Sequence, residues 1–480
     1  MSPVSAAAVQ RPAPGLDRQR QPIGPREVAD RAWVRVLRIA LVMGGGFTAA
    51  VVLFFAAPGP GPFLVEVPFV LRLMIVAVSV AWLGLLLVRR VHGEQYPGRV
   101  LTRGWSVAGT VALLAPLLIQ PVINLGSHPL LLAACVPTTA FGLWTMFAVQ
   151  RHRRLPGRLY LAVFGWGALV AAGLSGALNE LFVHYAAAYL DLFTDNPLQA
   201  AVAVRPLRGM HAGIVEELAK GAGVAVACLL ARRRIDGVVS GAVLGAAAGL
   251  GFNFTETVVY MSGADGGAGA QYWARQILGL LAAHTTFSAV LGAAIGAASQ
   301  QGDQRVRRTA IVCGVLAAAG AHALYNTWTI VQGRLLPDVS DAVQLLVVLP
   351  ASMLVLQGPL IVLQSLLLRH GLRTQAAGLA AELRAETADP AAAITPPEVP
   401  ILLDPRRRRA LHVAAFRRGG LPALRNLRRL HAAELDLAAG RWHRSRGEPP
   451  GDEPEDLAVR RGRVRELKRR HAALMTGGRR

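Results

Sequence analysis

The sequence predicts an all-α, polytopic membrane protein: a transmembrane helix bundle of about ten spans, followed by a basic, soluble, helical C-terminal tail. Of the 480 residues 53% are hydrophobic and the mean hydropathy is +0.40, which is too apolar for an ordinary soluble domain. Several apolar stretches also reach the ~20 residues that a helix needs to cross a ~30 Å hydrocarbon core. The three cysteines lie in such stretches, where we expect them to pack as small apolar side chains.

The distribution of arginine divides the chain into spans and orients them. We expect spans at about 37–57, 69–88, 105–124, 129–149, 159–179, 209–231, 236–260, 275–299, 309–331 and 342–368. The connections between them are alternately rich and poor in arginine, so the positive-inside rule predicts a multi-pass protein with both termini in the cytoplasm. We expect the plasma membrane as its location. Arg205 and Arg208 fall on the predicted outer side and run against this rule.

Composition also changes along the chain. We expect a disordered cytoplasmic N-terminus at 1–35, a transmembrane domain at 36–369, a Pro/Ala-rich linker at 370–405 and a basic helical cytoplasmic tail at 406–480. The formal net charge is +22, and 21 basic and 9 acidic residues after position 400 leave +12 in the tail. The run Arg406–Arg409 could bind anionic lipid headgroups or stay solvated, and charge alone would also allow nucleic acid. We favour the membrane surface over nucleic acid.

One apolar stretch carries three ionisable side chains. The run GIVEELAKGAG contains Glu216, Glu217 and Lys220, and each charge at a helix centre costs roughly 2.5–3.5 kcal/mol on insertion scales. Lys220 is one of only two lysines in the chain and follows Glu216 by four residues, which places both on one helix face. The group is either a structural ion pair between helices or part of a functional site.

Three later spans carry further polar groups: Glu256 in the seventh, His284 in the eighth, and His322 with Asn326 in the ninth. Each alone is explained as an interhelical hydrogen-bonding group. Together with the span that carries Glu216, these make four spans. At about 1.5 Å per residue, each places its polar group roughly 21–30 Å from its cytoplasmic end, in the outer half of the membrane. Glycines repeated every four residues in the seventh and eighth spans would let these helices approach closely.

Carboxylates and histidines in a partly dry cavity suit hydrolysis. A glutamate could take a proton from water while histidine and asparagine stabilise the tetrahedral intermediate. Alternatively, His284, His322 and Glu216 could hold zinc, which would activate the water instead. The sequence contains no HExxH motif, and the two histidines come from different helices, so no local motif supports the zinc alternative.

At these residues the chain resembles the PrsW family of intramembrane proteases. The resemblance covers about residues 209–331, the expected protease core, and rests on four motifs in the family's order: Glu216-Glu217-x-x-Lys220, Asp236-Gly237 through GLGFNFTETVVY with Glu256, Arg275 to His284, and His322-x-x-x-Asn326.

The wider resemblance is to the superfamily of CAAX prenyl endopeptidases and bacterial self-immunity proteases. It implies that Glu216 is the general base and that Glu217 supports it. His284 and His322 would position water or stabilise charge, and Asn326 would complete the oxyanion hole. Glu256 would be a further catalytic residue, and Lys220 and Arg275 would support these groups.

The resemblance also carries the label metalloprotease. An aspartate is common in PrsW-type sequences where this chain has Asn326, which removes one potential anionic ligand. We therefore favour a mechanism that requires no cofactor and keep zinc as the alternative.

The function predicted from the sequence is that of an intramembrane endopeptidase. It would cut a membrane-anchored protein substrate near the outer face of the lipid bilayer, in regulated proteolysis. A proton-coupled transporter is the main alternative, because buried Glu and His residues also form ion relays. A catalytically silent scaffold is a third.

Overall fold

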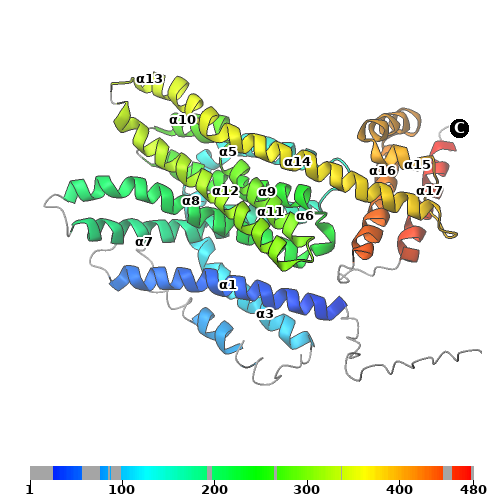
Figure 1. The fold of residues 1–480 in the computed structure, drawn as a ribbon, viewed down its shortest axis with the longest axis horizontal. Coiled ribbons are helices and arrows are strands. Elements are labelled where there is room, and N and C mark those ends of the chain that lie inside the picture. The colour runs from blue at the N-terminus through cyan, green and yellow to red at the C-terminus, as the bar shows by residue number, and fades with distance from the viewer. Residues whose placement is uncertain are drawn as a thin grey trace, which may run out of the picture.

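The computed structural model describes residues 25–56, 76–84, 87, 99–191, 197–263, 267–336, 338–446 and 457–476, and within these ranges every regular element is a helix. The predicted all-α class is therefore confirmed. The membrane region lies at one end of the molecule and the C-terminal helices pack at the other (Figure 1). The longer elements of the membrane region are α1 (Pro25–Ala56), α3 (Arg99–Leu114), α4 (Ile119–Ser127), α5 (Pro129–Ala148), α6 (Gly157–Gly165), α7 (Ala172–Asp191), α8 (Pro197–Leu230), α9 (Val238–Ser262), α11 (His284–Ser299), α12 (Gln304–Leu335) and α14 (Leu349–Thr387).

Seven helices in the described ranges are long and apolar enough to cross a membrane, so the expected count of about ten is not reproduced. The expected span at 69–88 lies mostly outside the described residues, which are helical at 76–84. Two other expected spans, in α8 and α11, fall short for physical reasons. The apolar part of α8 contains Glu216, Glu217 and Lys220, and α11 is only 16 residues long.

The span expected at 275–299 is interrupted, which corrects the prediction of one continuous helix. A π-helical turn, Trp273–Leu278, ends at Gly279, and α11 begins only at His284. The hydroxyls of Thr285 and Thr286 donate to the carbonyl oxygens of Leu280 and Leu281, and so satisfy backbone groups that the break leaves free. Unwound backbone at membrane depth is tolerated where protein surrounds it in this way. The break sets His284 at the start of a helix.

Helix α9 lies at the centre of the bundle and packs against α11 through glycine. A methyl group at Gly245 would lie 1.9 Å from the carbonyl oxygen of Ser288, and one at Gly249 would lie 2.2 Å from that of His284. On α11, a methyl at Gly292 would lie 2.2 Å from the carbonyl oxygen of Gly241. The close approach expected from the glycine repeats is therefore confirmed. It fixes the depth and rotation of the helix that carries His284.

This packing predicts a large effect for one methyl group. Gly245→Ala should force α9 and α11 apart and lower peptidase activity by at least about 10-fold, since a misplacement of ~1 Å can cost about 100-fold. Gly320→Ala on α12 is the matched control, because no atom from beyond the adjacent turns of its own helix lies within 4 Å of the added carbon. Cleavage rates of both purified variants check this. Equal rates for the two would contradict the proposed role of the contact.

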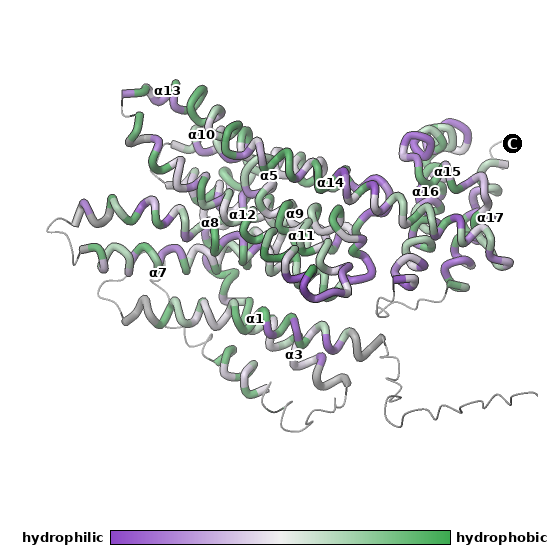
Figure 2. The backbone as a smooth tube through the Cα atoms, viewed as in Figure 1, coloured by the Kyte–Doolittle hydropathy of each residue, from purple (hydrophilic) through white to green (hydrophobic). Residues whose placement is uncertain are grey.

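The C-terminal helices form a small unit with its own hydrophobic core. The end of α14 packs with α15 (Glu398–Leu403), α16 (Pro405–Ser445) and α17 (Leu457–Thr476) around buried leucines such as Leu383 and Leu437. Many of the chain's hydrophilic residues gather in this unit (Figure 2). Helix α14 runs without a break from the membrane region to Thr387, so the first half of the expected linker, 370–387, is helical. Helix α1 likewise begins at Pro25, inside the expected N-terminal segment 1–35.

Asp236, in the turn between α8 and α9, joins this unit to the membrane region. Its carboxylate accepts hydrogen bonds from Arg153 at 2.7 Å, from Gln375 of α14 at 2.9 Å and from His443 of α16 at 3.0 Å. Burial alone would raise the pKa of Asp236, but the charge of Arg153 and the hydrogen bond of His443 lower it to about 2. The Asp236 carboxylate therefore stays ionised throughout the neutral pH range.

Candidate active site

Four helices bring the polar residues of the membrane region together. Helix α8 carries Glu216, Glu217 and Lys220, while α9, α11 and α12 contribute Glu256, His284 and His322. All six belong to the predicted site, and their contacts to one another form one network. We call these six residues the polar cluster.

Glu217 is the most deeply placed carboxylate of the polar cluster, with no exposed surface. One oxygen accepts from Lys220 Nζ at 2.6 Å and lies 3.0 Å from His322 Nδ1, and the other accepts from the Ser288 hydroxyl at 2.8 Å. A buried carboxylate is tolerated when it is both paired and hydrogen-bonded, and Glu217 is both. Its contacts hold three helices together.

Lys220 and Glu256 determine the tautomer of His284. An ammonium group has donors and no acceptor, so His284 Nδ1, at 3.1 Å from Lys220 Nζ, must offer its lone pair. The proton of the neutral ring is then on Nε2, which donates to Glu256 at 2.7 Å. Lys220 also lies over the ring of Phe252 at 4.1 Å. His284 is thus held from both sides.

Glu216 and His322 present free acceptors to each other. His322 donates its Nδ1 proton to Glu217, so its Nε2 keeps a lone pair. Glu216 Oε2 lies 3.6 Å from that nitrogen, and both atoms are buried without a hydrogen-bond partner among the described residues. Buried polar atoms of this kind are rare and call for a functional explanation. Two acceptors side by side suit a water molecule, whose two hydrogens they can receive.

Accessibility increases from Glu217 towards Arg275. The side chains of Glu216 and His322 are 4% and 1% exposed, whereas those of Glu256 and Arg275 are 16% and 22% exposed. Arg275 donates to Glu256 at 2.7 Å, and its guanidinium stacks on Tyr260 at 3.7 Å. The pair Glu256–Arg275 therefore forms the rim of the site, through which a substrate would approach.

Asn326 is the one predicted site residue that does not join this network. It lies one turn after His322 on α12 and is half-buried, and no hydrogen bond joins its amide to the polar cluster in the described part of the chain. Its main chain instead packs against Gly209 of α8.

Two residues that contact the polar cluster, and a third that contacts one of them, were not predicted from the sequence. Ser288 binds Glu217, Asn179 of α7 donates to Glu216 Oε1 at 3.3 Å, and His211 lies 3.0 Å from Asn179. For Asn179, the sequence offered one signal, a lone asparagine in an apolar stretch. That residue lies outside the expected protease core at 209–331.

Three residues are placed so that they could hold a metal. Donor atoms of Glu216, His284 and His322 lie within 4.8 Å of one another, and each histidine is backed by a carboxylate, as in many zinc sites. Tetrahedral zinc with bonds of ~2.1 Å would require donors roughly 3.4 Å apart. The donor types therefore suit zinc, but the arrangement does not, because Lys220 already occupies the Nδ1 lone pair of His284.

The charges of the site do not balance without a further positive charge. Glu216, Glu217 and Glu256 face two basic side chains, Lys220 and Arg275, so one negative charge is left when all five are ionised and both histidines are neutral. A proton or a bound cation would balance it, since isolated buried charge is costly.

Part of the chain matches a known protein family. Residues 155–356, from α6 into α14, match the model of the PrsW family of intramembrane metalloproteases. No curated protein and no solved structure matches the chain. The match contains every member of the polar cluster and leaves out the C-terminal unit. Residues 155–356 of this chain therefore match a PrsW-family intramembrane protease domain, and this family consists of peptide hydrolases.

Proposed function

We propose that this protein cleaves a membrane-anchored protein by means of a water molecule activated by Glu216. The observation that carries the proposal is the buried pair of free acceptors, Glu216 Oε2 and His322 Nε2, at 3.6 Å. A water that bridges them from the side of the site would donate one hydrogen to each and keep its lone pairs for attack. Few other buried arrangements in a protein would leave two acceptors facing each other.

The chemistry follows from the places of the side chains. Glu216 takes a proton from the water while the water oxygen bonds to the scissile carbonyl carbon. It later gives that proton to the nitrogen that leaves when the C–N bond breaks. Arg275 at the rim supplies N–H donors for the oxyanion. The amide of Asn326, which lies one turn after His322 and outside the network, would have to turn towards the site to add another donor. Glu217 and Glu256 fix the tautomers of His322 and His284.

We assign no step to a metal ion. Were the Lys220–His284 bond released, Glu216, His284 and His322 would hold a divalent cation, which would polarise the carbonyl and acidify the bound water. With the bond in place, the ammonium of Lys220 is the cation that faces these donors.

Depth in the membrane indicates where cleavage takes place. Glu216 lies 14 residues from the end of α8 at Leu230, or roughly 21 Å, beyond the middle of a ~30 Å core. The C-terminal unit packs near that end, beside Arg153. If this end faces the cytoplasm, as the arginine distribution indicates, the cut is made in the outer half of the plasma membrane.

Reconstitution tests the function directly. The full-length protein is placed in proteoliposomes with a single-pass reporter whose span and outer flank carry mass labels. We expect fragments cut within the outer half of the span, detected by mass spectrometry. Proton flux without any fragment would favour the transporter alternative.

We further propose that the C-terminal unit contacts anionic headgroups. Arg408, in the run Arg406–Arg409, donates to the carbonyl oxygen of Arg151 in the short connection between α5 and α6. The same helix exposes Val413 and Phe416, and basic helices with exposed apolar side chains bind anionic membrane surfaces. Native mass spectrometry should show more retained phosphatidylglycerol than phosphatidylcholine, and replacing Arg406 and Arg409 by Gln should remove that preference.

A further inference from the structure

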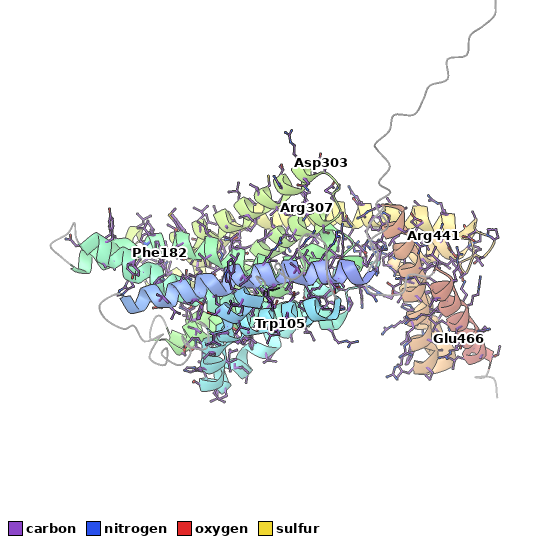
Figure 3. The ribbon with its side chains drawn as sticks, turned by 90° about the horizontal axis from the view of Figure 1, so that it is seen from below. Trp105, Phe182, Asp303, Arg307, Arg441 and Glu466 are labelled. Carbon is purple, nitrogen blue, oxygen red and sulfur yellow. The ribbon has the colours of Figure 1, made fainter. Side chains whose placement is uncertain are left out.

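A chain of hydrogen bonds leads from α7 into the polar cluster. Asn179 Nδ2 lies 3.3 Å from Glu216 Oε1, and Asn179 Oδ1 lies 3.0 Å from His211 Nδ1. The ring of His211 stacks on Phe182 with centroids 4.3 Å apart and planes 9° apart. Phe182 lies towards the end of the bundle far from the C-terminal residues Arg441 and Glu466 (Figure 3).

With Glu216 ionised, as a general base requires, one arrangement of protons satisfies this chain of bonds. An ionised carboxylate accepts and does not donate, so Glu216 must receive an N–H of the Asn179 amide. The amide oxygen then faces His211, whose Nδ1 must carry the proton and donate. Stacking on Phe182 holds the plane of the His211 ring. The orientation of the amide is thus set from the side away from the cluster.

The consequence for Glu216 is that its two oxygens become different. Asn179 engages Oε1, which leaves Oε2 to face His322 Nε2 at 3.6 Å. Rotation of the carboxyl group or of the side chain would break the Asn179 bond. The asparagine therefore selects which oxygen meets the water and from which direction.

We propose that Asn179 and His211 are positioning residues that orient the carboxylate of Glu216 for catalysis. The inference rests on the proposed role of Glu216 as general base. The competing explanation is that these residues only join α7 to α8, as polar groups often do between membrane helices. The two explanations differ in what happens to kcat.

The test compares variants of the reconstituted full-length enzyme. Asn179→Leu keeps the side-chain size and removes both hydrogen bonds, and should lower kcat roughly 10- to 100-fold while KM stays within about twofold. His211→Phe keeps the stacking on Phe182 but loses the donor, so it should lower kcat by a smaller factor. His211→Gln restores an N–H donor and should recover most of that loss.

Two controls separate positioning from helix packing. The double variant Asn179→Leu/His211→Phe should be no slower than Asn179→Leu alone, because His211 acts only through Asn179. Ser352→Ala removes an interhelical hydrogen bond from Trp328 at 2.8 Å, away from the cluster, and should lower thermal stability without changing kcat.

The possible outcomes are distinct. If Asn179→Leu behaves like Ser352→Ala, losing stability but keeping kcat, the positioning role is wrong and the proposed function stands. If the two single losses of kcat multiply in the double variant, His211 does not act through Asn179 and the inference fails in that part. If the wild-type enzyme cleaves no reporter, the proposed function itself has failed.

Discussion

Glu216→Gln should abolish cleavage and leave the protein folded. The amide keeps the size of the side chain and can still accept from Asn179 through its oxygen, but it cannot take a proton from water. Loss of a general base lowers rates by about 100- to 10,000-fold. Removing one of three carboxylates that face two basic side chains should not lower stability, because the cluster carries excess negative charge. Fragment yield in proteoliposomes and thermal unfolding of the same preparation measure both effects.

Glu217→Gln is the matched control, since it makes the same chemical change one residue away. Glu217 accepts from Lys220, His322 and Ser288. Its loss leaves the ammonium of Lys220 without its nearest counter-charge, which in buried pairs costs about 3–5 kcal/mol. The two variants should therefore differ: Glu216→Gln stable and inactive, Glu217→Gln unstable. Wild-type cleavage by Glu216→Gln would exclude Glu216 as the base.

Sequence alone was sufficient to find the polar cluster because charge is so costly inside a membrane. Glu216, Glu217 and Lys220 stand out in an apolar run, and rise per residue places Glu256 and His322 in the same half of the membrane. Their hydrogen bonds in the structure agree with that grouping. The family motifs supplied the order of the helices.

Other features depend on contacts between helices that no local pattern encodes. Asn179 resembles any interhelical asparagine until α7 is placed beside Glu216. The break before His284 depends on threonine hydroxyls that satisfy free carbonyl groups, so hydrophobicity alone predicted a continuous helix. The sequence indicates only that Asp236 precedes a helix, because its partners His443 and Gln375 lie more than 100 residues away in sequence.

Lys220→Met is expected to have the second large effect and to decide the role of metal. The wild-type protein should contain far less than one zinc per chain, and its cleavage should resist chelators, because the ammonium of Lys220 binds the lone pair of His284. Methionine is of similar length, carries no charge and cannot donate. The variant frees His284 Nδ1 to bind a metal ion together with Glu216 Oε2 and His322 Nε2. Glu216 Oε2 lies 4.0 Å from His284 Nδ1 and 3.6 Å from His322 Nε2.

The substitution also raises the excess negative charge of the site from one to two. In metal-free buffer Lys220→Met should therefore lose about 3–5 kcal/mol of stability, as expected when one partner of a buried ion pair is removed. Added zinc should restore much of this loss, because a ligand that binds only the folded state stabilises it. Lys220→Arg is the control, since it keeps the positive charge and should stay poor in zinc. Elemental analysis and thermal unfolding with and without zinc give the answer independently of activity. One zinc per wild-type chain, lost in His322→Ala together with cleavage, would overturn the assignment of Lys220 as the resident cation and make the enzyme metal-dependent.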